Sequence, residues 1–351
     1  MKKGLFAMLI LFSLVAWQCT RTDSDLSVKQ SLDQGVAKVN KALTAISESK
    51  GYELMTGNDD ITKADESYND SITLDLISGI YEFQPRSFVC SRTFKPYWFY
   101  KKTGESDSMI VKLPSYMAFH PRHLHDVTPP DSVPKNNFVI AASDYHFYYS
   151  VWHHFGYDYK LSAGLTLDTT DIGKIDIEAS GTSMSDNSYT SKYAFTDDYS
   201  IEVAFEAGDT ATKSFALLDG DEVLMKETRV FIWKDYHEAE KKYTLSIGNV
   251  DIVKSTGVDS IQVYLDGVLQ KTAAAKIIDS TETEEGSVCY HRDILLTFDD
   301  GTTAKLSDLL DPARTVLKTL VPAMHSMTFA RKVVDYIALT IYYRTYYFNG
   351  F

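Results

Sequence analysis

Three histidines and an aspartate lie close together in the segment HPRHLHDVTPPDSVP, residues 120–134. Imidazole and carboxylate groups are ligands that zinc and similar ions accept. Their spacing fits no common zinc motif, however, and the prolines are typical of an irregular loop. We therefore expect a polar loop and no cofactor, with zinc as the alternative. The zinc ligands would then be His120, His123, His125 and Asp126.

A second group of polar and aromatic residues occurs in YHFYYSVWHHFGYDY, residues 145–159. In a strand these side chains alternate between two faces, with Tyr145 and Phe147 on one of them. One face must pack on the core, so the other is either an aromatic binding platform or buried as well. Aromatic rings with polar tips suit sugars, aromatic ligands or partner proteins. The predicted ligand-binding residues are His146, Tyr148, Trp152 and His154, extended by Tyr97 and Trp98.

Common catalytic patterns are missing from the sequence. It contains no His-Glu-x-x-His, Gly-x-Ser-x-Gly, phosphate-binding glycine loop or Cys-x-x-Cys. No catalytic residue is predicted, and a non-catalytic binding or structural role is favoured, with a glycan, a lipid or a protein as ligand. The alternatives are a hydrolase or metal-dependent enzyme with its site near His120 to Asp126, and an adhesion or assembly component without a small ligand.

The N-terminus has the pattern of an export signal. Lys2 and Lys3 precede an apolar run that is too short to span a bilayer, and the run ends just before Cys19. This arrangement resembles the lipobox of bacterial lipoproteins, and the acidic residues after Cys19 are similar to the tether of Bacteroidetes lipoproteins. The resemblance implies a signal peptide over 1–18, acylation of Cys19 and attachment to the outer membrane, on either its periplasmic or its surface face. Ordinary secretion is the alternative.

The charge of the chain disfavours nucleic acid as a partner. The 351 residues carry a formal charge of −13, and removing residues 1–18 takes away two lysines and no acid, which gives −15. Binding to a phosphate backbone needs clustered lysine and arginine. The predicted partners are therefore the membrane, through the lipid, and a glycan, lipid or protein. Cys90 and Cys289 are either bridged or free.

Hydrophobic periodicity predicts one N-terminal helix and then many strands. Apolar residues in 27–48 recur at helical spacing, and Gly51 lies near the expected end of the helix. From about residue 71 the period changes to two, most clearly in YKLSAGLTL. Tight hairpin turns are predicted at Asp219-Gly220, Gly248-Asn249, Asp266-Gly267 and Gly301, which indicates a meander from about 155 to 305.

The C-terminal region starts with a helix signal at Asp311-Pro312. Segment 336–348 alternates like a strand and is rich in Tyr and Ile, and although a helical stripe also fits, we favour a strand. The fold class is α+β and mainly antiparallel β, with a long meander forming a curved sheet or partly open barrel packed by helical segments from both ends of the chain. The expected parts are 1–18 signal peptide, 19–26 lipidated tether, 27–52 helix, 53–305 β body, either single or divided near 130–140, and 306–351 C-terminal segment.

Overall fold

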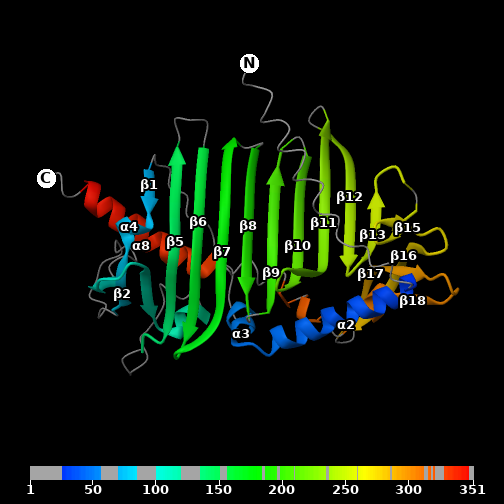
Figure 1. Cartoon of the computed structure of the whole chain (residues 1–351), viewed down its shortest axis with the longest axis horizontal. Coiled ribbons are helices and arrows are strands. Elements are labelled where there is room, and N and C mark those ends of the chain that lie inside the picture. Colours follow the sequence, from blue (N-terminus) through cyan, green and yellow to red (C-terminus); the bar gives the residue numbers. More distant parts are fainter. Residues whose placement is uncertain are drawn as a thin grey trace, which may run out of the picture.

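The computed structural model shows an open, mainly antiparallel sheet of 15 strands, with a second sheet of three strands near one end (Figure 1). This confirms the predicted class, a long meander packed by an N-terminal and a C-terminal helix. The structure describes residues 26–56, 70–84, 100–119, 135–150, 156–183, 186–195, 198–208, 210–234, 237–258, 260–284, 287–311, 315–317, 319–320 and 328–347.

The strands of the large sheet follow one another almost in chain order. From β4 to β15 each strand pairs with the next one in the sequence, β2 lies parallel to β4, and β3 and β15 end the main path. Because β4 pairs directly with β5, the strands on both sides of 120–134 belong to one sheet. The strands of this sheet are β1 (Asp70–Thr73), β2 (Gly79–Phe83), β3 (Tyr100–Gly104), β4 (Met109–Leu113), β5 (Phe138–Ser150), β6 (Gly156–Leu167), β7 (Thr170–Ser183), β8 (Asp186–Ala194), β9 (Tyr199–Ala207), β10 (Thr210–Asp219), β11 (Glu222–Lys234), β12 (His237–Ile247), β13 (Val250–Ser255), β14 (Gln262–Leu265) and β15 (Val268–Leu269).

The second sheet consists of three antiparallel strands. They are β16 (Ala274–Glu284), β17 (Ser287–Thr297) and β18 (Thr303–Lys305). A single bridge between Ile261 and Ala275 links this sheet to the end of the large one. The strands are thus divided between two sheets after β15.

The hairpin turns were predicted correctly. Gly220, Gly248, Gly267 and Gly301 have φ angles between 57° and 79°, which residues with a side chain rarely adopt. The β6–β7 turn was not predicted, because Asp168 and Thr169 adopt positive φ there without a glycine.

Helix α2 (Val28–Ser47) confirms the helix expected over 27–48. It starts with a capping box, in which Ser27 Oγ accepts from the backbone N–H of Gln30 and the Gln30 side chain accepts from that of Ser27. Gly51 does not end this helix, since it lies inside α3 (Lys50–Thr56). A side chain there would begin 2.4 Å from the Ile172 carbonyl oxygen, so glycine allows α3 to approach β7 closely.

The prediction of a strand from residue 336 is wrong. Residues Thr328–Tyr347 form helix α8, which passes behind β1, β5 and β6 in the view of Figure 1. Its buried residues follow helical spacing from Phe329 to Ala338, so packing of this stripe outweighs the strand propensity of Tyr, Ile and Thr. Residues 315–317 and 319–320 are also helical, as expected after Asp311. Three further short helices are α4 (Leu74–Ile77), α5 (Ser115–Phe119) and α6 (Leu306–Leu309).

Helix α2 packs against β9 and β11–β13, along the lower ends of these strands in Figure 1. The contact is close, because a Cβ atom on Gly35 would lie 2.9 Å from Ile247 Cγ2. One hydrophobic core contains the inner faces of both α2 and α8 together with one face of the large sheet. The two helices therefore cover the same face of the sheet at different places.

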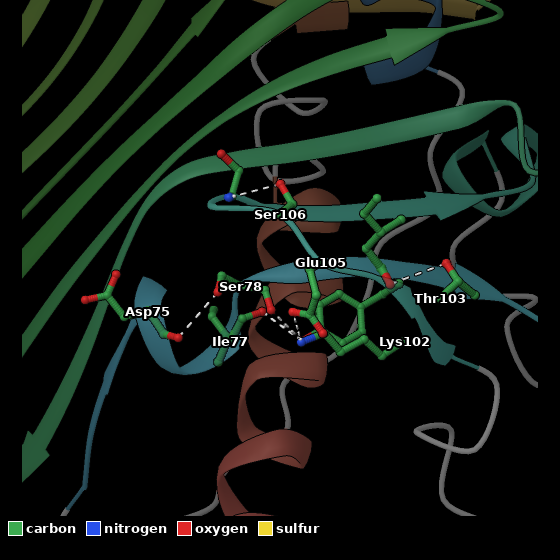
Figure 2. Close-up of polar contacts among 10 residues, drawn as sticks. Asp75, Ile77, Ser78, Lys102, Thr103, Glu105 and Ser106 are labelled. Atoms are coloured by element: carbon green, nitrogen blue, oxygen red, sulfur yellow. Dashed lines mark hydrogen bonds and ion pairs between the residues drawn. The ribbon is translucent and has the colours of Figure 1, made fainter.

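Polar contacts that include Ile77, Ser78, Lys102 and Glu105 lie where α4, β2 and β3 meet (Figure 2). The Tyr81 hydroxyl donates to the carbonyl oxygens of Ile77, at 2.9 Å, and Ser78, at 3.3 Å. Burial, together with the charge of Glu105, raises the pKa of Tyr81 to about 12. Lys102 and Glu105 form an ion pair with an N–O distance of 2.7 Å. The Tyr81 hydroxyl thus joins β2 to the end of α4, and Thr103 Oγ1 of β3 donates to the Ile80 carbonyl oxygen of β2 at 3.5 Å.

Candidate functional site

A row of aromatic and cationic side chains crosses five strands of the large sheet. Phe205 pairs with Lys213, Lys213 with Arg229, Arg229 with Tyr243, and Tyr243 with Lys254. Directly paired residues of antiparallel strands project from the same face, so all five side chains lie on one side. With strands about 4.8 Å apart, the row is roughly 19 Å long. We call these five residues the aromatic–cation row.

The row lies on the helix-covered face but beyond helix α2. The buried residues opposite α2 include Ile201, Leu217 and Ile247. Phe205, Lys213 and Tyr243 each lie four residues along the same strand from one of these, and therefore on the same face. Four residues of extended chain correspond to about 13 Å. Lys213 and Arg229 are therefore exposed while sharing a face with the core.

Each of the central cations lies over an aromatic ring. The Lys213 Nζ atom is 5.5 Å from the centroid of Phe205, and the Arg229 Cζ atom is 5.9 Å from that of Tyr243. Arg229 also pairs with Glu227 at 2.6 Å, and its side chain is 60% exposed. Burial, together with the charge of Glu227, raises the pKa of Tyr243 to about 12, so the phenol is neutral at physiological pH. The Arg229 guanidinium thus faces solvent as part of an ion pair, and Lys213 adds an exposed ammonium beside it.

An apolar groove begins where the row ends. It lies between β12, β13 and the neighbouring Ile261 on one side and β16–β17 of the small sheet on the other, and its volume is about 280 Å³. Ile277 is 50% exposed on one wall and pairs with Ile294, while Ile252 and Ile261 belong to the opposite wall. We call this the isoleucine groove; it is lined by Tyr243, Ile252, Lys254, Ile261, Ile277, Arg292, Asp293 and Ile294.

The charged residues of the groove have different roles. Asp293 is structural, because its carboxylate accepts hydrogen bonds from the backbone of Ile294, at 2.7 Å, and from the Ser307 hydroxyl. The Lys254 ammonium donates to the Val258 carbonyl oxygen. Arg292 is exposed opposite Asp279 and forms no ion pair within the described residues. Two cations thus border a mostly apolar depression.

At the other end of the face, α8 covers a buried polar cluster. The hydroxyls of Tyr145 and Tyr159 donate to the same Asp335 oxygen, at 3.1 and 3.0 Å. Arg331 pairs with Asp335 at 3.3 Å, and its guanidinium carbon lies 4.3 Å from the centroid of the Tyr159 ring. Burial raises the pKa of the Asp335 carboxyl, although Arg331 and the two hydroxyls oppose this shift. We assign this cluster to the attachment of α8, since its polar groups satisfy one another.

Two of the predicted ligand-binding residues lie on the opposite face. His146 and Tyr148 are in β5, where Tyr148 is 36% exposed, and they pair with Lys160 and Asp158 of β6. Because Tyr148 is exposed, the alternative that both faces of this strand are buried does not hold at Tyr148. Lys160 binds Asp144 at 3.0 Å, so this face carries solvated ion pairs.

The other predicted site residues fall outside the part of the chain that the structure describes. This applies to the lipidation residue, to four further residues of the aromatic platform and to all four candidate zinc ligands. The pairing of Cys90 with Cys289 is likewise untested, because Cys90 lies outside that part. These residues are Cys19, Tyr97, Trp98, Trp152, His154, His120, His123, His125 and Asp126.

The row was not predicted from the sequence. Phe205 and Tyr243 are far apart in the chain, and only the strand register brings them into line with Lys213 and Arg229. Among the described residues, no group of three or more His, Cys, Asp or Glu side chains could hold a metal ion. No helix within the described ranges has the length and apolar character needed to cross a membrane.

No protein-family model matches the chain, and neither a curated protein nor a solved structure is significantly similar to it.

Proposed function

We propose that this chain is an envelope-anchored lipoprotein that binds an anionic ligand on the helix-covered face of its sheet. The aromatic–cation row is the observation that carries the proposal. The chain carries a formal charge of −13, yet Lys213 and Arg229 are paired neighbours on an exposed stretch of this face. Clustered charges of one sign recruit and orient a ligand of the opposite sign.

The geometry of the row favours binding over catalysis. Its charged groups are guanidinium and ammonium groups, and the Tyr243 phenol holds its proton because burial raises its pKa to about 12. This phenol is therefore not suited to accept a proton near neutral pH. Flat rings beside fixed cations instead offer contacts to the apolar and the acidic parts of one ligand.

Binding to the row is tested by removing its two central charges. We use the purified full chain and measure tetragalacturonate and decanoate by isothermal titration calorimetry. The double variant Lys213→Gln and Arg229→Gln should lose about tenfold in affinity for tetragalacturonate, because each lost charge contact is worth about 0.5–1 kcal/mol. Binding should also weaken as salt increases.

A cation on the other face serves as the matched control. Lys192 of β8 pairs with Glu202, so it projects away from the row, and Lys192→Gln should leave affinity unchanged. The proposal fails if neither anion binds, or if Lys192→Gln weakens binding as much as the double variant does.

Attachment to the envelope depends on Cys19, and a single substitution tests it. The apolar run that ends before Cys19 supports acylation of its thiol. We expect the full chain to sediment with membranes and Cys19→Ser to appear in the soluble fraction. Mass spectrometry of the mature N-terminus should show the mass of the acyl chains, and an unmodified Cys19 would refute the anchor.

A further inference from the structure

We infer that the isoleucine groove takes the alkyl chain of a single-chain anionic amphiphile, whose acidic head lies at Lys254 and Arg292. The inference rests on the proposed function and names the class of its ligand. Tyr243 and Lys254 belong to both the groove and the aromatic–cation row, so the two features form one continuous surface.

The walls of the groove indicate an apolar occupant. Ile277 exposes half of its surface there, and Ile294 beside it is only half-buried. Apolar surface left in water costs about 25 cal/mol per Å², and covering it with an alkyl chain recovers that free energy. Contiguous apolar surface with a polar rim is typical of ligand-binding grooves.

The size of the groove indicates a single narrow chain. Its volume of about 280 Å³ lies just below the range of roughly 300–1,000 Å³ typical of sites for drug-sized ligands. The groove therefore offers room for one alkyl chain of moderate length along its apolar walls.

The charges at the rim indicate an acidic head. Lys254 and Arg292 border the groove, and Asp293 is engaged by Ser307 and Ile294. Asp279, which is paired opposite Arg292, forms no ion pair with Arg292 among the residues that the structure describes. A carboxylate or phosphate at this rim would gain two cationic partners in a chain of net negative charge.

A series of chain lengths tests the inference directly. Titration of the full chain with octanoate, decanoate and dodecanoate should show affinity rising about fourfold per added methylene, the value for burial of one CH₂ group. Decanol, which has the chain without the charge, should bind about tenfold more weakly than decanoate. Dodecyl phosphate then shows whether a phosphate head is accepted as well as a carboxylate.

Substitutions separate the wall of the groove from its rim. Ile277→Ser should lower the affinity for decanoate about tenfold and reduce the gain per methylene. Val268→Ser is the matched control, since Val268 is 52% exposed in β15 and does not line the groove, and it should change nothing. Arg292→Gln should weaken binding of decanoate but not of decanol.

The outcomes distinguish this inference from the proposed function. Binding that does not depend on chain length, or equal effects of Ile277→Ser and Val268→Ser, refutes the groove. If tetragalacturonate binds through Lys213 and Arg229 while decanoate does not bind, the proposed function stands and the amphiphile is wrong. If neither anion binds, the proposed function itself fails.

Discussion

Asp335→Ala should lower the free energy of unfolding by about 3 kcal/mol. Removing one partner of a buried pair typically costs about 3–5 kcal/mol, and the lower end applies here because the Asp335 side chain is 23% exposed. The substitution leaves Arg331 without its carboxylate, and it leaves the hydroxyls of Tyr145 and Tyr159 without their shared acceptor. Urea denaturation followed by tryptophan fluorescence measures the loss.

Two companion variants make this prediction specific to the cluster. Asp335→Asn keeps an acceptor oxygen for the tyrosines, and because burial already disfavours the charged carboxyl it should cost less than alanine. The double variant Arg331→Met and Asp335→Leu removes both charges, so it should be more stable than Asp335→Ala alone. A double variant that is less stable than Asp335→Ala would show that the cluster does not attach α8.

Gly35→Leu should destabilise the protein by about 2 kcal/mol although leucine is the better helix former. Leucine gains about 0.8 kcal/mol over glycine inside a helix. Its Cβ atom would lie 2.9 Å from Ile247 Cγ2 and 3.2 Å from the Ile247 carbonyl oxygen, however, and overpacking costs about 1–3 kcal/mol. The clash outweighs the gain in helix propensity, because the new side chain would contact the Ile247 backbone, which cannot move aside as a side chain can.

The control is a glycine with space around it. A Cβ atom on Gly164 of β6 would meet nothing within 4 Å, so Gly164→Ala should change stability by less than about 0.5 kcal/mol. The melting temperatures of Gly35→Leu and Gly164→Ala, compared with that of the unchanged protein, test both expectations. A fully stable Gly35→Leu protein would mean that α2 is free to shift away from the Gly248 turn.

Local patterns predicted the elements that depend on neighbouring residues. The capping residues and the apolar stripe of α2 are continuous in sequence, and the turn glycines lie where the chain requires positive φ. Helix α8 was mistaken for a strand because both periods fit its apolar residues. The four-residue spacing of Arg331 and Asp335 suits an ion pair on a helix. The hydrogen bonds from Tyr145 and Tyr159 to Asp335, which fix this helix on the sheet, depend on the tertiary structure.

The candidate site depends on relations that a single sequence does not contain. Phe205 and Lys254 are brought into one row by the registers of four strand pairs, and a shift of one residue in any of them would turn the next side chain to the other face. The isoleucine groove needs in addition the placement of the second sheet, for which no local signal exists. The types of the residues could be predicted from the sequence, but not which of them become neighbours.

The place of α2 has a consequence for the order in which the molecule folds. Its apolar stripe is made early in synthesis, whereas its partners in β9 and β11–β13 follow more than 150 residues later. An isolated helix of this length is marginal in water, so α2 gains lasting structure only after those hairpins have formed. We therefore expect the hairpins to assemble one after another from local contacts, and the docking of α2 to be a late, long-range step that closes the loop across half of the chain.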